Sequence, residues 1–357
     1  MSADTAPRPP SADPEAQTPP VLRADSVEVA FTAGFAPGGG RGIARAVDGV
    51  HLDVRPGEIV ALVGESGCGK TTLARTLLGL ERPTAGRVLF EGEPLRYRSR
   101  DLRAYRRRVQ LVQQDPMGSL NPRRTVYESV VEGLRVHEGT TVDEPERVER
   151  ALSRAGLRPP ERFLSRYPHE LSGGQRQRVV IAGALVLDPE VLVADEPVAS
   201  LDASVRGEIL RLLLELRDEL GLSALVATHD LGLAWNIADR VAVMYLGRVV
   251  ELGTVEEVLS APAHPYTRAL LSVLPDSDVE EGPVVLSGEP PDPEQVPSGC
   301  RFHPRCPILA SGEAERAGVA DRCSSVDPAI LGGGAERRVA CHWAAADGSG
   351  RLLERAT

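Results

Sequence analysis

Lysine is almost absent from this chain of 357 residues, because Lys70 is the only lysine among its 41 basic residues. Arginine serves at every other position that carries a permanent positive side chain. A guanidinium group is a wide planar fork, whereas an ammonium group is a compact charge at the end of a thin stem. We therefore expect Lys70 to lie in a confined anion-binding site whose shape excludes arginine.

Aromatic residues are also scarce, at 4% of the chain, which disfavours recognition of nucleic acid by base stacking. The formal net charge of −10 argues in the same direction, because binding to a phosphate backbone requires a basic surface. We therefore expect no nucleic-acid partner.

Long apolar runs are missing as well. The longest, VVIAGALVL, ends at Asp188 and falls well short of the ~20 residues that a membrane-spanning helix requires. Residues 1–20 are rich in proline, alanine and acidic residues and lack the pattern of a signal peptide, so we expect a disordered leader there. These features predict a cytoplasmic chain, in a compartment where structural disulfides are rare.

The hydrophobic pattern predicts an α/β fold. Residues 59–80 begin with an apolar run, continue through a glycine-rich turn and end in a pattern typical of a helix. Strands are also expected at 21–30, 190–197 and 223–230, a strand pair at 240–253, an amphipathic helix at 201–220, and a Gly- and Pro-rich loop at 34–42.

Changes in composition divide the chain. A polar, irregular stretch at about 115–170 predicts a small helical insert within a main domain of residues 21–260. Proline, glycine and cysteine increase after residue 260, which predicts a separate C-terminal extension over 261–357.

Residues 64–71, GESGCGKT, match the pattern G-x-x-x-x-G-K-[ST] between the expected strand and helix. The backbone N–H groups of such a loop surround a phosphate, and the helix that follows adds positive potential. Lys70 would reach between two phosphates, and the Thr71 hydroxyl would bind Mg²⁺. The sequence therefore predicts a P-loop nucleotide site formed by Gly64, Glu65, Ser66, Gly67, Cys68, Gly69, Lys70, Thr71 and Thr72.

Two adjacent carboxylates end the apolar strand VLVADEP. Asp195 is placed to hold the Mg²⁺ shell, and Glu196 to polarise a water for in-line attack on a γ-phosphate. A second glycine-rich segment, LSGGQ, places Ser172 where a helix would begin, a position that offers free N–H groups and a hydroxyl to an anion.

Together with the P-loop, the segments LSGGQ, VLVADEP, ASLD (199–202) and THD (228–230) make residues 21–260 resemble the ATPase subunits of ABC transporters. The resemblance implies a P-loop NTPase core with a β-subdomain and a helical insert, and ATP with Mg²⁺ as its ligands. It also implies that Ser172, Gly173, Gly174 and Gln175 close over ATP held by a second chain.

Further roles follow from the same resemblance. Gln114 matches the glutamine that senses Mg²⁺ and the membrane subunit, although Gln113 lies beside it. His229 matches the histidine that contacts the γ-phosphate, and Asp202 would lie at the dimer interface. Phe31 falls where an aromatic ring stacks on adenine; the alternative is a core phenylalanine at a strand end.

The segments RRVQLVQQDPMGSLNPRRTVYESV and HPYTRALLSVLP resemble the dipeptide/oligopeptide branch of ABC importers. This resemblance implies a peripheral subunit at the cytoplasmic face of the membrane. Its partners would be a second ATPase subunit, identical or homologous, two transmembrane permease subunits and an extracellular solute-binding protein. Nickel or another small solute as cargo, or a soluble ABC ATPase that is not coupled to transport, are the alternatives.

Four of the five cysteines, Cys300, Cys306, Cys323 and Cys341, lie in the expected extension. Four thiolates suit tetrahedral Zn²⁺ or an iron–sulfur cluster equally. The stretch GCRFHPRCP with two later cysteines resembles the tail of some peptide-importer ATPases that is associated with a [4Fe–4S] cluster. A cluster, zinc and no metal are therefore the three alternatives, and the fifth cysteine, Cys68, is expected to be inert.

Overall fold

The computed structural model describes most of the chain, namely residues 19–35, 41–199, 201–273, 284, 286, 288–328 and 337–346. Residues 1–18 of the expected leader, and Ser200 of the ASLD segment, lie outside this range. Within it, no helix is both long and apolar enough to cross a membrane.

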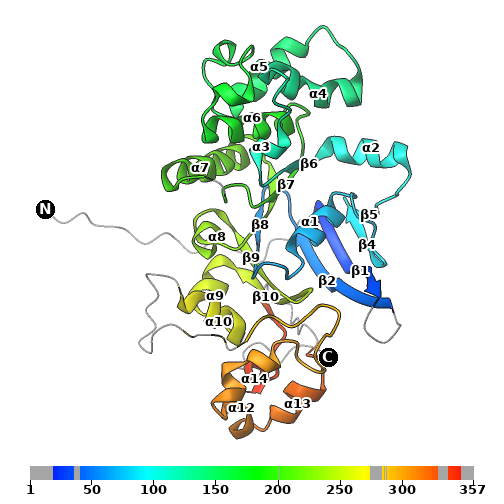
Figure 1. Ribbon diagram of the computed structural model, residues 1–357, viewed down its shortest axis with the longest axis vertical. Helices are drawn as coiled ribbons and strands as arrows, with labels where there is room; N and C mark the ends of the chain where they lie inside the picture. The colour runs from blue at the N-terminus through cyan, green and yellow to red at the C-terminus, as the bar shows by residue number, and fades with distance from the viewer. Residues whose placement is uncertain are drawn as a thin grey trace, which may run out of the picture.

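A seven-stranded sheet forms the centre of the molecule, with the strand order β11-β10-β9-β3-β8-β7-β6 (Figure 1). The inner strands are parallel and almost wholly buried, as continuous runs of Val, Ile, Leu and Ala dictate. The strands are β3 (Ile59–Val63), β6 (Val109–Val112), β7 (Val191–Asp195), β8 (Ser223–Thr228), β9 (Arg240–Tyr245), β10 (Arg248–Thr254) and β11 (Arg338–Val339).

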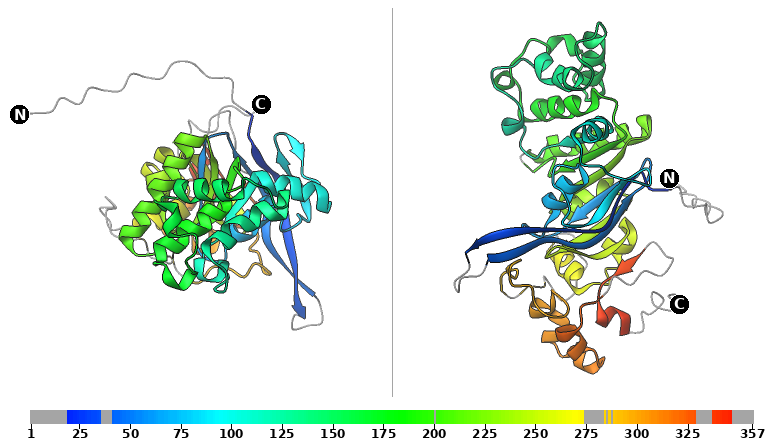
Figure 2. Two further views of the ribbon diagram at one scale, coloured as in Figure 1. Left: turned by 90° about the horizontal axis from the view of Figure 1, so that it is seen from above. Right: turned by 90° about the vertical axis from the view of Figure 1, so that its right-hand side faces the viewer.

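A second, antiparallel sheet has the order β2-β1-β4-β5 and consists of β1 (Leu22–Phe35), β2 (Arg41–Val54), β4 (Ala85–Phe90) and β5 (Glu93–Pro94). Figure 2 shows the long β1 and β2 strands projecting together from the body. The loop expected at 34–42 is therefore wrong at both ends. Pairing of Phe35 with Arg41 extends the two strands into the Gly- and Pro-rich stretch, because the ladder supplies hydrogen bonds that composition does not reveal.

Helices cover the central sheet and form a separate group above it (Figure 1). They are α1 (Lys70–Leu77), α2 (Ser99–Arg108), α3 (Pro116–Ser119), α4 (Val126–Glu138), α5 (Glu144–Arg154), α6 (Gly173–Leu185), α7 (Ala203–Leu220), α8 (Leu231–Ile237), α9 (Val255–Ser260), α10 (Pro265–Ser272), α11 (Pro307–Ala310), α12 (Glu313–Arg316), α13 (Ala320–Ser325) and α14 (His342–Ala346).

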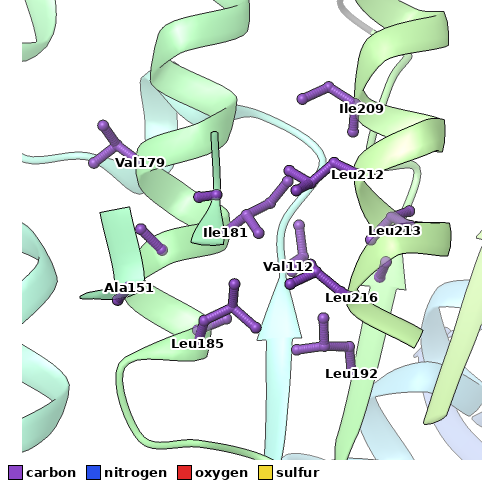
Figure 3. Close-up of a cluster of buried hydrophobic side chains, with 14 of the residues drawn as sticks. Val112, Ala151, Val179, Ile181, Leu185, Leu192, Ile209, Leu212, Leu213 and Leu216 are labelled. Atoms are coloured by element: carbon purple, nitrogen blue, oxygen red, sulfur yellow. The ribbon is translucent and has the colours of Figure 1, made fainter. Parts of the chain in front are cut away.

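The helical insert and the sheet share one core. Side chains of α5, α6 and α7 meet those of β6 and β7 in the cluster of Figure 3, which includes Ile181, Leu185, Leu192, Leu212 and Leu216. All five are at most 3% exposed, and fully burying an aliphatic side chain of this size contributes about 1.5–3 kcal/mol. This packing fixes the start of α6 relative to the carboxyl ends of the strands.

The C-terminal extension is joined to the main domain rather than separate from it. Its strand β11 pairs antiparallel with β10 and forms the edge of the central sheet. A two-residue strand has no detectable period, so the sequence offered no sign of this pairing. The helices α11 to α14 lie at the end of the molecule opposite the helical insert (Figure 1).

Candidate functional site

Four parallel strands bring the predicted site residues to one edge of the central sheet. The loop 64–69 follows β3, Asp195 ends β7, His229 follows β8, and Gln114 comes two residues after β6. The register pairs Val63 with Thr228 and Asp195 with Ala227, so these carboxyl ends are level with one another. In sheets of this kind ligands bind beyond the carboxyl ends of the strands.

The loop after β3 can be built only with glycine at its two ends. Gly64 has a φ of 155° and Gly69 a φ of 109°, in the region that side-chain-bearing residues avoid. A Cβ at Gly64 would lie 2.2 Å from the Met244 carbonyl oxygen, and a Cβ at Gly69 would lie 2.1 Å from that of Ala46. The two glycines therefore let the loop pack against β9 and β2 and turn directly into α1.

The side chain of Lys70 lies inside the loop that it ends. The residue is 7% exposed, and its Nζ donates hydrogen bonds to the carbonyl oxygens of Gly64 at 2.7 Å and Glu65 at 3.0 Å. The thiol of Cys68 is buried beside it, and burial raises the pKa of that thiol. The confinement expected from the lone lysine is present, and a protonated, buried thiol fits the expected inertness of Cys68.

Thr71 of α1 and Asp195 at the end of β7 are joined by a hydrogen bond. The Thr71 hydroxyl donates to Asp195 Oδ1 at 3.3 Å. Burial raises the pKa of the Asp195 carboxyl; the hydrogen bond from Thr71 opposes this increase, and the charge of Glu196 adds to it. Mg²⁺ is commonly held by one or two carboxylates together with substrate phosphates, so a hydroxyl and a carboxylate at this place fit that ion.

Glu196 and His229 are in direct contact. His229 Nδ1 lies 2.8 Å from Glu196 Oε1, and the Glu196 N–H donates to the Ala227 carbonyl oxygen at 2.8 Å. Glu196 has a φ of 49°, a left-handed conformation that costs about 1–2 kcal/mol for a residue with a side chain. Such strain is concentrated at functional sites, where the surrounding structure over-determines it.

The segment LSGGQ begins helix α6 through a capping box. Ser172 Oγ accepts from the Gln175 N–H at 3.2 Å, and Gln175 Oε1 accepts from the Ser172 N–H at 3.0 Å. A Cβ at Gly174 would lie 2.5 Å from Val205 Cγ1 of α7, so glycine at this position allows close packing of the two helices. Ser172 itself is exposed, and the capped helix end faces solvent.

The predicted residues Asp202 and Gln114 lie outside the loop and the Glu196–His229 contact. Asp202 caps α7 by accepting from the Val205 N–H at 3.0 Å, and this bond, with one from Ser204, lowers the pKa of its carboxyl. Gln114 is exposed, while Gln113 is held by a hydrogen bond from Ser119 at 2.8 Å.

Phe31 is 42% exposed, so the alternative of a core phenylalanine is wrong. It pairs with Ala44 of β2, two residues before Ala46, whose carbonyl oxygen faces Gly69 of the nucleotide loop. The ring therefore belongs to the strand pair that adjoins the loop.

Two protein families match parts of this chain. The family described as ABC transporter matches residues 47–199, and the family described as oligopeptide/dipeptide transporter, C-terminal region, matches residues 250–311. The oligopeptide transport ATP-binding protein AppF of Bacillus subtilis (strain 168) is 46% identical over 274 residues, which cover 75% of this chain and 83% of AppF. The chain belongs to the oligopeptide-type ATP-binding proteins of the ABC transporter family.

Other relatives agree with this membership. The oligopeptide transport ATP-binding protein OppF of Escherichia coli (strain K12) is 45% identical over 298 residues, which cover 80% of this chain and 89% of OppF. Among solved structures, cbiO1 from Clostridium perfringens, part of the ABC transporter complex cbiONQ, has a TM-score of 0.59 at 34% identity and covers 68% of this chain and 91% of its own.

A dimeric structure of the ATP-binding cassette MJ0796 with ADP and Pi has a TM-score of 0.57 at 29% identity, over 66% of this chain and 98% of that one. Membership of the ABC family confirms the predicted P-loop NTPase fold, ATP hydrolysis as the enzyme class, and ATP with Mg²⁺ as the ligands.

The sequence did not predict that the C-terminal extension of this ABC protein touches the nucleotide loop. Tyr266 Oη accepts a hydrogen bond from the Glu65 N–H at 2.9 Å, and Arg305 forms an ion pair with the Glu65 carboxylate. The partners are 201 and 240 residues apart in the chain, so no local pattern could have revealed the contact.

The four cysteines of the extension line one small cavity of about 10 Å³, together with His264, His303 and His342. Burial raises the pKa of Cys300 to about 12 and that of Cys341 to about 11. Among the described residues, however, no group of three or more His, Cys, Asp or Glu side chains is arranged to hold a metal ion. The described residues therefore bring four thiols to one cavity but show no ligand set for an iron–sulfur cluster or a zinc ion.

Proposed function

We propose that the chain is the ATPase subunit of an ABC importer and drives peptide uptake across the cytoplasmic membrane. The observation that carries the proposal is the match of residues 250–311 to the oligopeptide/dipeptide transporter C-terminal region. The names of the relatives, which include oligopeptide transport and peptide import ATP-binding proteins, support the same cargo.

The residues at the carboxyl ends of the strands have different roles in ATP hydrolysis. Lys70 and the N–H groups at the start of α1 bind the phosphates of ATP, and the exposed ring of Phe31 would stack on adenine. Thr71 and Asp195, with Gln114 beyond β6, would hold Mg²⁺, which when bound neutralises phosphate charge. Glu196 accepts a proton from the attacking water. His229 would contact the γ-phosphate, and its 2.8 Å contact with Glu196 also orients that carboxylate.

One chain carries one P-loop and one LSGGQ segment, so a complete site needs two chains. We place Ser172, Gly173, Gly174 and Gln175 over the ATP of the partner subunit, with Asp202 at the interface. The exposed, capped start of α6 supports this placement, because helix N-termini bind anions. To convert a mostly open pair into a mostly closed one, ATP must favour the closed form by about 5.5 kcal/mol.

The remaining parts of the proposal concern assembly. The main domain spans residues 21–260, with the helical subdomain at about 115–170 and the extension at 261–357. The partners are a second ATPase subunit, identical or homologous, two permease subunits and an extracellular solute-binding protein. The chain then lies at the cytoplasmic face of the membrane as a peripheral subunit.

Reconstitution tests the cargo. We expect the ATPase activity of the assembled transporter in vesicles, with its binding protein, to be stimulated by di- or oligopeptides. Stimulation by Ni²⁺ or another small solute alone would replace the proposed cargo. Full activity of the chain without any permease, unchanged by adding one, would favour an ATPase that is not coupled to transport.

The cysteines form a separate proposal, a [4Fe–4S] cluster or Zn²⁺ held by Cys300, Cys306, Cys323 and Cys341. Its support is the convergence of four thiols on one cavity, since thiolates suit both groups. Iron, sulfide and zinc analysis of chain purified without oxygen tests it, with a variant carrying Cys306→Ser as control. Equal metal content in the variant and the original chain would contradict the assignment.

A further inference from the structure

Glu65 is the single acidic residue of the nucleotide loop 64–72, and two residues of the C-terminal extension hold it. Arg305 binds its carboxylate through both terminal nitrogens, Nη1 to Oε2 at 2.9 Å and Nη2 to Oε1 at 3.3 Å. Tyr266 Oη accepts the Glu65 N–H at 2.9 Å. This backbone N–H is therefore engaged by the extension.

The ion pair is shielded from water. The Arg305 side chain is 8% exposed and that of Glu65 is 25% exposed. A bidentate arginine–carboxylate pair of this kind is stronger and more specific than a single hydrogen bond. Because solvent screens the pair poorly, removal of the guanidinium would leave the Glu65 charge largely uncompensated.

The segment that carries Arg305 is itself fixed to the nucleotide site. Arg301 pairs with Asp48 of β2 and donates to the Leu246 carbonyl oxygen, at the turn between β9 and β10. The next residue of that turn, Gly247, donates its N–H to the Cys68 carbonyl oxygen in the nucleotide loop at 2.8 Å. The residues 301–305 thus hold the loop directly at Glu65 and indirectly through the turn.

Aromatic packing makes the same connection. The Phe302 ring lies 5.3 Å from that of Tyr266 and 5.2 Å from that of Tyr245, and the two tyrosine rings lie 4.7 Å apart. All three residues are at most 1% exposed. Edge and tilted contacts at these distances are favourable and confine each ring, so Tyr266 is held where it meets Glu65.

We infer that Arg305 is a positioning residue for nucleotide binding, which neutralises Glu65 and so prevents its carboxylate from repelling the triphosphate. The inference rests on the proposed ATP site and extends it, because it makes the C-terminal extension a working part of that site. A carboxylate near a polyphosphate weakens binding through Coulomb repulsion, which is large at sites that solvent screens poorly. With Arg305 in place, the net charge of the pair is zero.

The test is equilibrium binding of Mg-ATP to the full chain and to three variants, Arg305→Gln, Glu65→Gln and the double variant. We expect Arg305→Gln to raise the Kd for Mg-ATP about tenfold, which corresponds to about 1.4 kcal/mol. In the Glu65→Gln background the same change should alter the Kd by less than about threefold, since no carboxylate remains to be neutralised. Arg305→Lys keeps the charge and should recover most of the affinity.

The matched control is Arg337→Gln. Arg337 is another arginine of the extension, and it pairs with Glu251 of β10 at 2.8 Å instead of with the loop. We expect it to lower thermal stability without changing the Kd. A purely structural role for Arg305 would give equal losses of affinity in the single and double variants.

Two outcomes overturn the inference by itself: an unchanged Kd in Arg305→Gln, or a double variant as weak as Arg305→Gln while the original chain binds normally. Failure of the original chain to bind Mg-ATP is distinguishable from both. That result would overturn the proposed function and this inference with it.

Discussion

Replacement of Lys70 by arginine preserves the charge and changes only the shape of the cationic group. Lys70 Nζ lies 2.7 Å and 3.0 Å from two carbonyl oxygens of its own loop, and the residue is 7% exposed. A guanidinium cannot enter this space without displacing the loop, and overpacking of this kind costs about 1–3 kcal/mol. Displacement also removes a preorganised donor from the transition state, a loss that typically lowers kcat by about 10²–10³.

We therefore expect Lys70→Arg to lower the rate of phosphate release at saturating Mg-ATP by at least about 10²-fold. The assay is steady-state phosphate release, with Lys70→Met as the reference for loss of both charge and shape. If charge alone mattered, the arginine variant would retain near-normal turnover while the methionine variant would not. That result would refute the explanation for the single lysine.

Three further predictions follow from the site and its supports. Glu196→Gln should keep its affinity for Mg-ATP but release phosphate at least about 10²-fold more slowly, because general-base catalysis contributes about that much. Equal losses of binding affinity and turnover would argue against a general-base role for Glu196. Gly174→Ala should lower the free energy of unfolding by about 1–3 kcal/mol, because the new Cβ would lie 2.5 Å from Val205. At Gly183 nothing lies within 4 Å of a new Cβ, so Gly183→Ala should raise the free energy of unfolding by about 0.5–1 kcal/mol. Urea denaturation of both variants measures these changes. Asp195→Asn should stabilise the nucleotide-free chain at neutral pH while abolishing Mg²⁺-dependent hydrolysis. Burial raises the pKa of the Asp195 carboxyl, so the folded chain holds the proton more tightly than the unfolded chain does. The free energy of unfolding therefore falls as pH rises from the unfolded pKa through the folded pKa of this carboxyl. Thermal melts across that pH range should show a smaller decrease in melting temperature for the variant than for the original chain.

The sequence carried enough information for the core of the site because its residues follow strands whose burial is visible locally. The runs that became β3, β7 and β8 are continuous apolar stretches, and each chemical group stands at or just after a strand end. Parallel pairing of these strands then brings their carboxyl ends to the same side of the sheet. The motif spacing was therefore sufficient to place Lys70 and Asp195 at a common edge.

The contacts that could not be predicted lie between segments far apart in the chain. The pairing of β11 with β10 involves two residues of each strand, and the contacts of Glu65 with Tyr266 and Arg305 span more than 200 positions. Such contacts are set by packing of the finished fold and leave no periodic trace. The strained φ of Glu196 is likewise imposed by its surroundings, since glutamate has no intrinsic preference for that conformation.

The most direct test of the central claim, a nucleotide held jointly by two chains, is complementation between two inactive variants. Ser172→Arg damages the segment that should face the partner's ATP, and Lys70→Met damages the P-loop. We predict that each variant alone fails to hydrolyse ATP. An equal mixture should recover about a quarter of normal phosphate release, because about half of all dimers then contain one copy of each variant, and each of these has one intact site of two. Undiminished hydrolysis by Ser172→Arg alone would contradict the account, and no recovery in the mixture would contradict a pair of identical chains.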